Sequence, residues 1–78
     1  MRKEMYAELY EKLGKCYMMK RDYEEASSNI EKMIELYNDL KAPSFIAQGQ
    51  FNMGLIKMAE EKWKEAAEYF ASSVEILK

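Results

Sequence analysis

The sequence has no histidine and a single cysteine, Cys16, among its 78 residues. A zinc site needs a cluster of cysteine and histidine ligands, and an internal disulfide needs a second cysteine, so both are excluded. Because no histidine is present to activate the thiol and Cys16 follows the apolar spacing of its segment, we expect a small core residue rather than a nucleophile. The unpaired cysteine favours a reduced compartment, and we therefore expect a cytoplasmic, intracellular protein.

Glycine, proline and long apolar runs are also scarce. The only proline is Pro43, and the three glycines, Gly14, Gly49 and Gly54, are isolated, so no glycine-rich phosphate loop is present. No apolar run approaches the roughly 20 residues that cross a membrane, and none follows the charged start of the chain. The sequence therefore predicts neither a membrane span nor a signal peptide.

Basic stretches are missing as well. The net charge is −2 and the isoelectric point is about 5.2, with lysines and glutamates mixed along the chain. Binding to nucleic acid or to an anionic membrane needs a basic face that replaces counterions. We therefore expect neither nucleic acid nor a membrane as a partner.

Carboxylates and tyrosines are abundant, but their arrangement does not indicate catalysis. The sequence has 14 acidic residues and six tyrosines. Pairs such as Glu24-Glu25 and Glu60-Glu61 lie where solvated helix faces and helix ends place charges, and nothing indicates a perturbed pKa or a cleft. We therefore expect no enzyme activity and no cofactor.

The sequence does contain a strong helical periodicity. Apolar residues recur three and four positions apart, without any strand pattern. Asp22 with Glu25 predicts an N-cap and its capping-box partner, Pro43 marks a helix break, and Ser44 is the expected N-cap after it. The turn before Trp63 lacks a capping aspartate. The sequence predicts four helices, over residues 3–19, 23–40, 45–60 and 63–77.

Two pieces of the sequence recur after forty residues. Residues 13–17 and 23–26 correspond to residues 53–57 and 63–66. In each copy a glycine lies twelve residues before an alanine, and an aromatic residue lies three before that alanine. An internal repeat of this length indicates a helical solenoid. With 49% hydrophobic and 33% charged residues, we expect one all-α domain, residues 1–78, of two antiparallel helix-turn-helix repeats at about 3–40 and 44–78.

The recurring small residues predict how the helices of each repeat pack. Glycine on the first helix and alanine on the second let the two backbones approach closely, and larger side chains fill the space beside them. The expected small residues on facing helices are Gly14 and Gly54 on the first helices and Ala26 and Ala66 on the second, and the expected filling residues are Tyr23, Trp63, Ile30 and Phe70.

These residues resemble the tetratricopeptide repeat, whose first helix carries a large residue, Leu-Gly and Tyr, and whose second helix carries Ala, an aromatic or aliphatic residue and a small residue. Repeat one matches at Tyr10, Leu13, Gly14, Tyr17, Tyr23, Ala26 and Ile30, and repeat two at Met53, Gly54, Trp63, Ala66, Phe70 and Ser73. Met33 departs from the small-residue position, and Gln50 and Lys57 occupy two aromatic positions. The forty-residue period exceeds the usual length of about 34 and is similar to that of Pins-type scaffolds and bacterial Rap-type peptide sensors.

The resemblance implies a non-catalytic scaffold for protein–protein interaction. Members of the family bind a peptide or a partner helix on the concave surface of their first helices, and the partner is therefore expected to be a protein or peptide. The carboxylate clamp of the chaperone-binding members is not matched, and an apolar, methionine-containing half-groove suits an amphipathic helix or a hydrophobic peptide. The corresponding residues here are Glu11, Lys15, Met18, Phe51, Asn52, Leu55 and Met58.

Two alternatives remain open at this level. One is a homo-oligomer, either a natural small protein or a repeat fragment, in which Phe51, Leu55 and Met58 pack against a helix of another copy. The other is the peptide-sensing segment of a larger bacterial Rap-type regulator, and so part of a longer repeat protein. The predicted last helix carries apolar residues on more than one face, among them Val74 and Leu77. The third and fourth predicted helices are therefore expected to be buried against another copy or a partner.

Overall fold

The computed structural model describes residues 2–78, and Met1 of the predicted domain lies outside them. Its four helices are α1 (Arg2–Met19), α2 (Tyr23–Asp39), α3 (Pro43–Ala59) and α4 (Trp63–Leu77). The predicted helix boundaries are confirmed to within two residues, and residues 2–78 form no strand. The chain therefore has the all-α, helical-repeat fold that its periodicity predicts.

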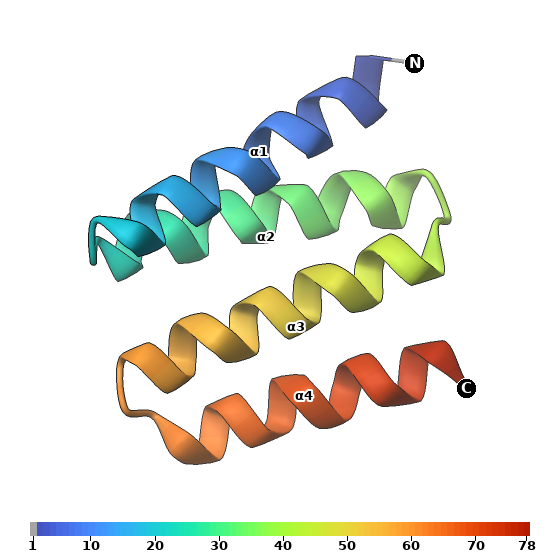
Figure 1. Cartoon of the computed structure of the whole chain (residues 1–78). Helices are drawn as coiled ribbons and strands as arrows, with labels where there is room; N and C mark the ends of the chain where they lie inside the picture. The colour runs from blue at the N-terminus through green and yellow to red at the C-terminus, as the bar shows by residue number, and fades with distance from the viewer. Residues whose placement is uncertain (1) are drawn as a thin grey trace.

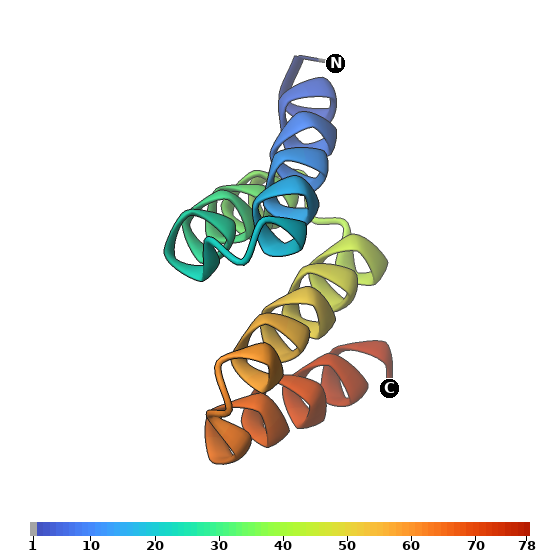
Figure 2. The same cartoon turned by 60° about the vertical axis from the view of Figure 1, so that its left-hand side comes forward.

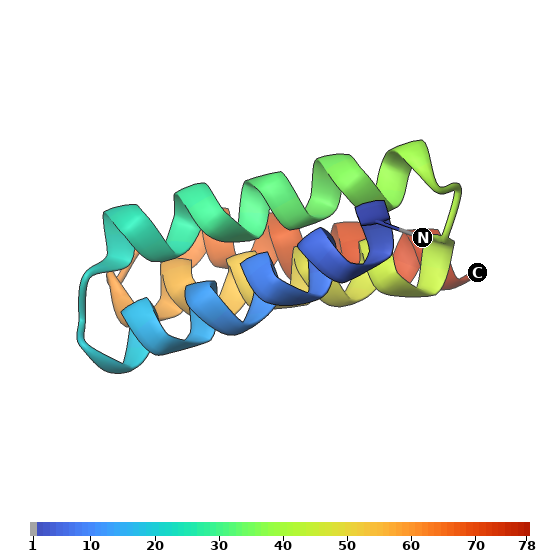
Figure 3. The same cartoon turned by 90° about the horizontal axis from the view of Figure 1, so that it is seen from above.

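The helices stack in chain order, and each runs antiparallel to the next (Figure 1). α1 packs on α2, α3 packs on α4, and contacts between α2 and α3 join the two pairs. α1 and α2 lie over α3 and α4 when the stack is seen from above (Figure 3), and α1 and α4 form its two ends (Figure 2). The Cα atoms span 36 × 30 × 12 Å. Because the shortest of these dimensions is only 12 Å, little of the chain lies far from solvent, and this flat stack buries few residues completely.

The core lies in the middle of the stack. The largest fully buried side chains, Ile30, Met33, Met53 and Ile56, all belong to α2 and α3. The outer helices α1 and α4 contribute only small buried residues, such as Ala7 and Ala66. The two helix pairs are therefore held together mainly by the side chains of α2 and α3.

The predicted close approaches within each pair are confirmed. A Cβ on Gly14 would lie 2.5 Å from Ile30 Cδ1, and a Cβ on Gly54 would lie 2.5 Å from the Phe70 ring. Ala26 is completely buried. Glycine at these positions therefore makes room for a side chain of the facing helix, as the repeat spacing predicts.

Two predictions about burial are wrong. Cys16 is exposed, because it lies on the side of α1 that faces away from the rest of the stack. Trp63 is 61% exposed instead of filling space within its pair. Both residues lie on an end helix, where the side away from the stack has no neighbouring helix among residues 2–78.

The three turns are built in the same way. Each has three residues, and the middle one has a positive φ of 52–66°. The last residue of each turn donates its N–H to the carbonyl five positions before it, at 2.8–3.1 Å, which closes the end of the helix in a Schellman-type arrangement. The middle residues are Arg21, Lys41 and Glu61. The middle residues of successive turns are twenty positions apart, so two helices with their turns give the forty-residue period.

The helix N-termini differ from turn to turn. Asp22 accepts a hydrogen bond from the Glu25 backbone N–H at 3.4 Å, which confirms the predicted cap of α2. The prediction that Ser44 caps α3 is wrong, because the helix begins at Pro43 with Ala42 as N-cap. Proline fits the first helical position, where its fixed φ is helical and a backbone N–H is not needed. Lys62 is the N-cap of α4 and makes no side-chain cap bond.

Lys62→Asp is expected to stabilise the chain by about 0.5–1 kcal/mol, because it supplies the cap that α4 lacks. Lys62 Nζ lies 3.9 Å from Glu60 Oε1, but Lys57 Nζ is closer to the same oxygen, at 3.6 Å, and remains there in the variant. Urea titration measures the change. Lys64→Asp is the matched control, since it makes the same charge change inside the first turn without a capping position. An equal gain in both variants would attribute the effect to charge alone and contradict the cap.

Candidate protein-binding surface

A hydrogen bond joins the first helices of the two pairs. Gln48 Nε2 of α3 donates to Glu11 Oε2 of α1 at 3.1 Å, across 37 residues of sequence. Lys15 Nζ lies 3.4 Å from the same oxygen, and the Glu11 side chain is only 15% exposed. The structure therefore brings the predicted residues Glu11 and Lys15 beside α3, and it adds Gln48, which the sequence analysis did not select.

Asn52 lies one turn after Gln48 on the same side of α3. It is only 8% exposed, and its Nδ2 atom is buried without a hydrogen-bond partner. A buried donor that makes no hydrogen bond costs about 1–3 kcal/mol. A small part of the residue stays at the surface of α3. Asn52 is therefore the most distinctive polar group of the predicted set.

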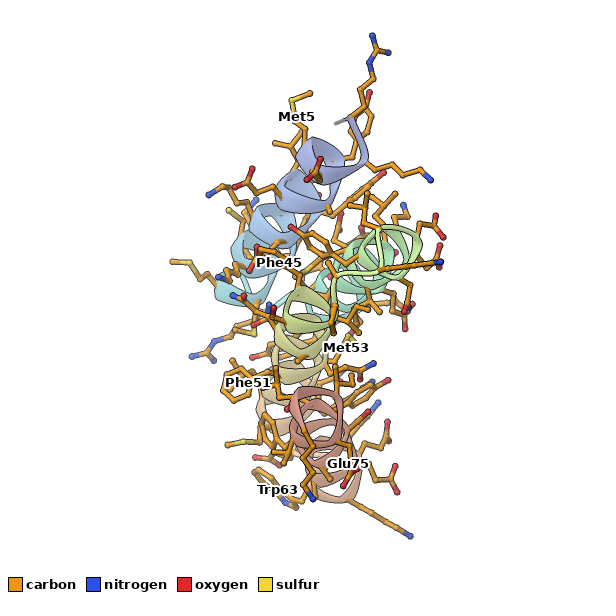
Figure 4. The ribbon with its side chains drawn as sticks, turned by 90° about the vertical axis from the view of Figure 1, so that its right-hand side faces the viewer. Met5, Phe45, Phe51, Met53, Trp63 and Glu75 are labelled. Atoms are coloured by element: carbon orange, nitrogen blue, oxygen red, sulfur yellow. The ribbon has the colours of Figure 1, made fainter. Side chains whose placement is uncertain are left out.

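The apolar members of the set surround Asn52 along α3. Phe51 is 48% and Met58 is 44% exposed, and Leu55 is half-buried. Met18 of α1 is also half-buried and packs against the core. The Phe51 side chain projects from the side of the stack on which the Trp63 side chain also lies (Figure 4). We call the seven predicted residues the α1/α3 surface: Glu11, Lys15, Met18, Phe51, Asn52, Leu55 and Met58.

Phe51 also reaches toward the end of the stack. Its ring lies 5.3 Å from the Phe70 ring of α4, and it borders an apolar cleft of about 440 Å³ between α3 and α4. We call this cleft the open cleft, and it is lined by Ser44, Ala47, Gln48, Phe51, Ser73 and Leu77. The α1/α3 surface and the open cleft therefore share Phe51.

A second, acidic pocket was not predicted from the sequence. This pocket of about 330 Å³ lies where α1, α2 and the start of α3 meet, and the Tyr37 and Phe45 rings stack beside it at 4.7 Å. Burial raises the pKa of the Tyr37 phenol, and the nearby carboxylates of Glu11, Glu8 and Glu4 raise it further. The signal in the sequence was the spacing of these three glutamates, which places them on one face of a helix. Carboxylates beside aromatic rings suit a cationic group.

Ion pairs hold the turn between α3 and α4. Lys57 Nζ lies 3.6 Å from Glu60 Oε1 and 3.7 Å from Glu65 Oε1, and its side chain is 15% exposed. Glu60 Oε1 is buried and forms no hydrogen bond, so its charge is balanced by Lys57 and, at 3.9 Å, by Lys62 Nζ. Lys57 therefore has a structural role at a position where the repeat resemblance leads one to expect an aromatic residue.

Within residues 2–78, no group of three or more histidine, cysteine, aspartate or glutamate side chains is arranged to hold a metal ion. The described part of the chain also contains no helix with the length and apolar character needed to cross a membrane. No protein-family model, curated protein or solved structure matches the chain.

Proposed function

We propose that this protein is a non-catalytic scaffold of the tetratricopeptide-repeat type that binds a peptide or partner helix on its α1/α3 surface. The forty-residue repeat and the close glycine contacts of each helix pair support the assignment. The observation that carries the proposal is the Nδ2 donor of Asn52, which is nine-tenths buried and lacks a partner on a surface rimmed by Phe51 and Met58. A bound polypeptide supplies both the missing acceptor and apolar side chains for the rim.

The chemistry of the surface favours an extended segment of the partner over the middle of a helix. Carbonyl oxygens inside a helix are already hydrogen-bonded, whereas those of an extended chain or of a last helical turn are available to Asn52. The exposed side chains of Phe51 and Met58, which lie before and after Asn52 along α3, offer adaptable apolar contacts to the bound chain. Glu11 and Lys15 place both charge signs at the α1 edge, so they orient the bound chain more than they attract it.

Asn52→Leu is expected to stabilise the chain by about 1 kcal/mol, because it removes a buried donor that makes no bond. The same variant is expected to bind peptides at least tenfold more weakly, a loss of about 1.4 kcal/mol. The probes are peptides selected on the wild-type protein from a random displayed library. Thermal unfolding measures stability, and fluorescence anisotropy of the labelled peptides measures binding.

Asn29→Leu is the matched control. Asn29 is as buried as Asn52, but its Nδ2 atom donates to the Glu25 carbonyl at 2.8 Å and it lies on α2. This variant is expected to lose about 1 kcal/mol of stability and to keep its affinity for the peptides. Selected peptides that bind Asn52→Leu as tightly as wild type would contradict the proposed site.

A further inference from the structure

α3 covers the side of repeat one that faces repeat two, and its contacts with α2 show how this side is buried. Phe45 of α3 stacks on Tyr37 of α2, which is only 6% exposed as a result. Gly49 of α3 lies against Ile34, since a Cβ at this glycine would collide with the Ile34 side chain. The first helix of the second repeat therefore seals the face of the first repeat.

The equivalent face of repeat two is open. Forty residues after Ile34 and Tyr37 stand Val74 and Leu77, which are 56% and 65% exposed. The open cleft lies at the same place. Its lining residues correspond, forty positions earlier, to Glu4, Ala7, Glu8, Glu11, Met33 and Tyr37. Two of these, Glu11 and Tyr37, are the residues that Gln48 and Phe45 of α3 contact in repeat one. The open cleft thus lies at the position of repeat two that corresponds to the one α3 covers in repeat one, and a helix with an apolar face like that of α3 would cover it.

α1 carries a similar apolar face on the side that points away from the stack. The α3 residues that face repeat one include Phe45, Ile46, Gly49 and Met53, and Met53 is only 1% exposed. Forty residues earlier, α1 carries an apolar residue at each of these positions, and each is 44–55% exposed. We call this stripe the outer face of α1, and it consists of Met5, Tyr6, Leu9 and Leu13.

We propose that a second copy of this chain docks head to tail, with the outer face of its α1 on the open cleft and the exposed side of α4. α1 of the second copy then packs on α3 and α4 of the first copy in the same way as α3 packs on α1 and α2 within one chain. The two faces lie at opposite ends of the stack, so each copy offers one of each and the contact is heterologous (Figure 1). The α1/α3 surface of one copy continues into that of the next, which lengthens the binding surface.

Two features support a second copy as the occupant. The chain exposes 5421 Å², whereas a compact monomer of 9.2 kDa exposes about 4,900 Å². The excess of about 500 Å² is consistent with two uncovered apolar ends. The internal repeat also supplies the geometry, because the α2–α3 contact already joins equivalent elements within one chain.

The contact between copies is looser than the contact inside the chain. Leu9 stands where α3 has Gly49, and Val74 stands where α2 has Ile34. Leucine in place of glycine adds a whole side chain, whereas valine in place of isoleucine removes only one methylene. The helices of two copies therefore lie farther apart than α2 and α3 do. The association is therefore reversible and depends on concentration.

Two single-face variants test the head-to-tail contact. Leu9→Lys places a charge on the outer face of α1, and Val74→Lys places one beside the open cleft. Both residues are about half exposed, so both variants are expected to fold, as circular dichroism checks. In sedimentation between micromolar and millimolar concentration, the wild type is expected to associate and each variant alone to stay at 9.2 kDa.

A mixture of the two variants is expected to form a dimer, because each retains the face that the other has lost. Ser28→Lys, at an exposed position of α2, controls for added charge and is expected to associate like the wild type.

Three results would overturn the proposal. A wild type that stays monomeric at millimolar concentration rules out self-association. A variant that still dimerises alone shows that the contact is formed by two copies of the same face. A mixture that stays monomeric shows that the two faces are not complementary. None of these results bears on peptide binding by Asn52, so they leave the proposed function to its own test.

Discussion

Met33→Ala is expected to destabilise the chain by about 3 kcal/mol, the largest single effect that we predict. Met33 is completely buried in the core that joins the two helix pairs, and truncation leaves a cavity there. A chain of 78 residues is stable by only about 4–12 kcal/mol. The midpoint of thermal unfolding is therefore expected to fall by about 15 °C.

Ser73→Ala is the control for Met33→Ala at the equivalent position of repeat two. Ser73 borders the open cleft, and its hydroxyl donates only to the Phe70 carbonyl of its own helix. The change is expected to stay within about 0.5 kcal/mol. Similar losses in both variants would contradict the assignment of the Met33→Ala loss to a cavity in the core.

Ala66→Leu is expected to destabilise the chain by about 1–3 kcal/mol, because the larger side chain forces α3 and α4 apart. Ala66 is only 2% exposed, on the helix that faces Gly54. Ala67, the next residue, is exposed, so Ala67→Leu is expected to change stability by less than about 0.5 kcal/mol. Equal unfolding midpoints for the two leucine variants would show that the helices do not meet at Ala66.

The fold was predictable because its signals are local. Apolar spacing fixes the face of each helix, and Asp22 marks the start of α2 through its own side chain. The repeated glycine and alanine spacing also identifies where two helices approach, since a close approach of two helices requires small residues at the same positions of both repeats. The incorrect cap at Ser44 has a local cause as well, because Pro43 both breaks the preceding helix and occupies the first position of α3.

The candidate surface was less predictable, because it depends on how helices meet. Periodicity placed Cys16 and Leu13 on an apolar face, but it could not show that this face of α1 has no neighbouring helix among residues 2–78. The hydrogen bond between Gln48 and Glu11 depends on the register between α1 and α3, which the sequence of either helix does not contain. The missing partner of Asn52 is likewise visible only after packing.

The most direct test of the proposed function is the nuclear magnetic resonance spectrum of the Asn52 side-chain amide. With Nδ2 unpartnered in the free chain, a peptide that supplies a carbonyl acceptor is expected to move these amide proton resonances downfield and to slow their exchange with water. The Asn29 side-chain amide, already bonded to the Glu25 carbonyl, is expected to stay in place. A selected peptide that binds while the Asn52 resonances remain unchanged would contradict the proposed role of the α1/α3 surface.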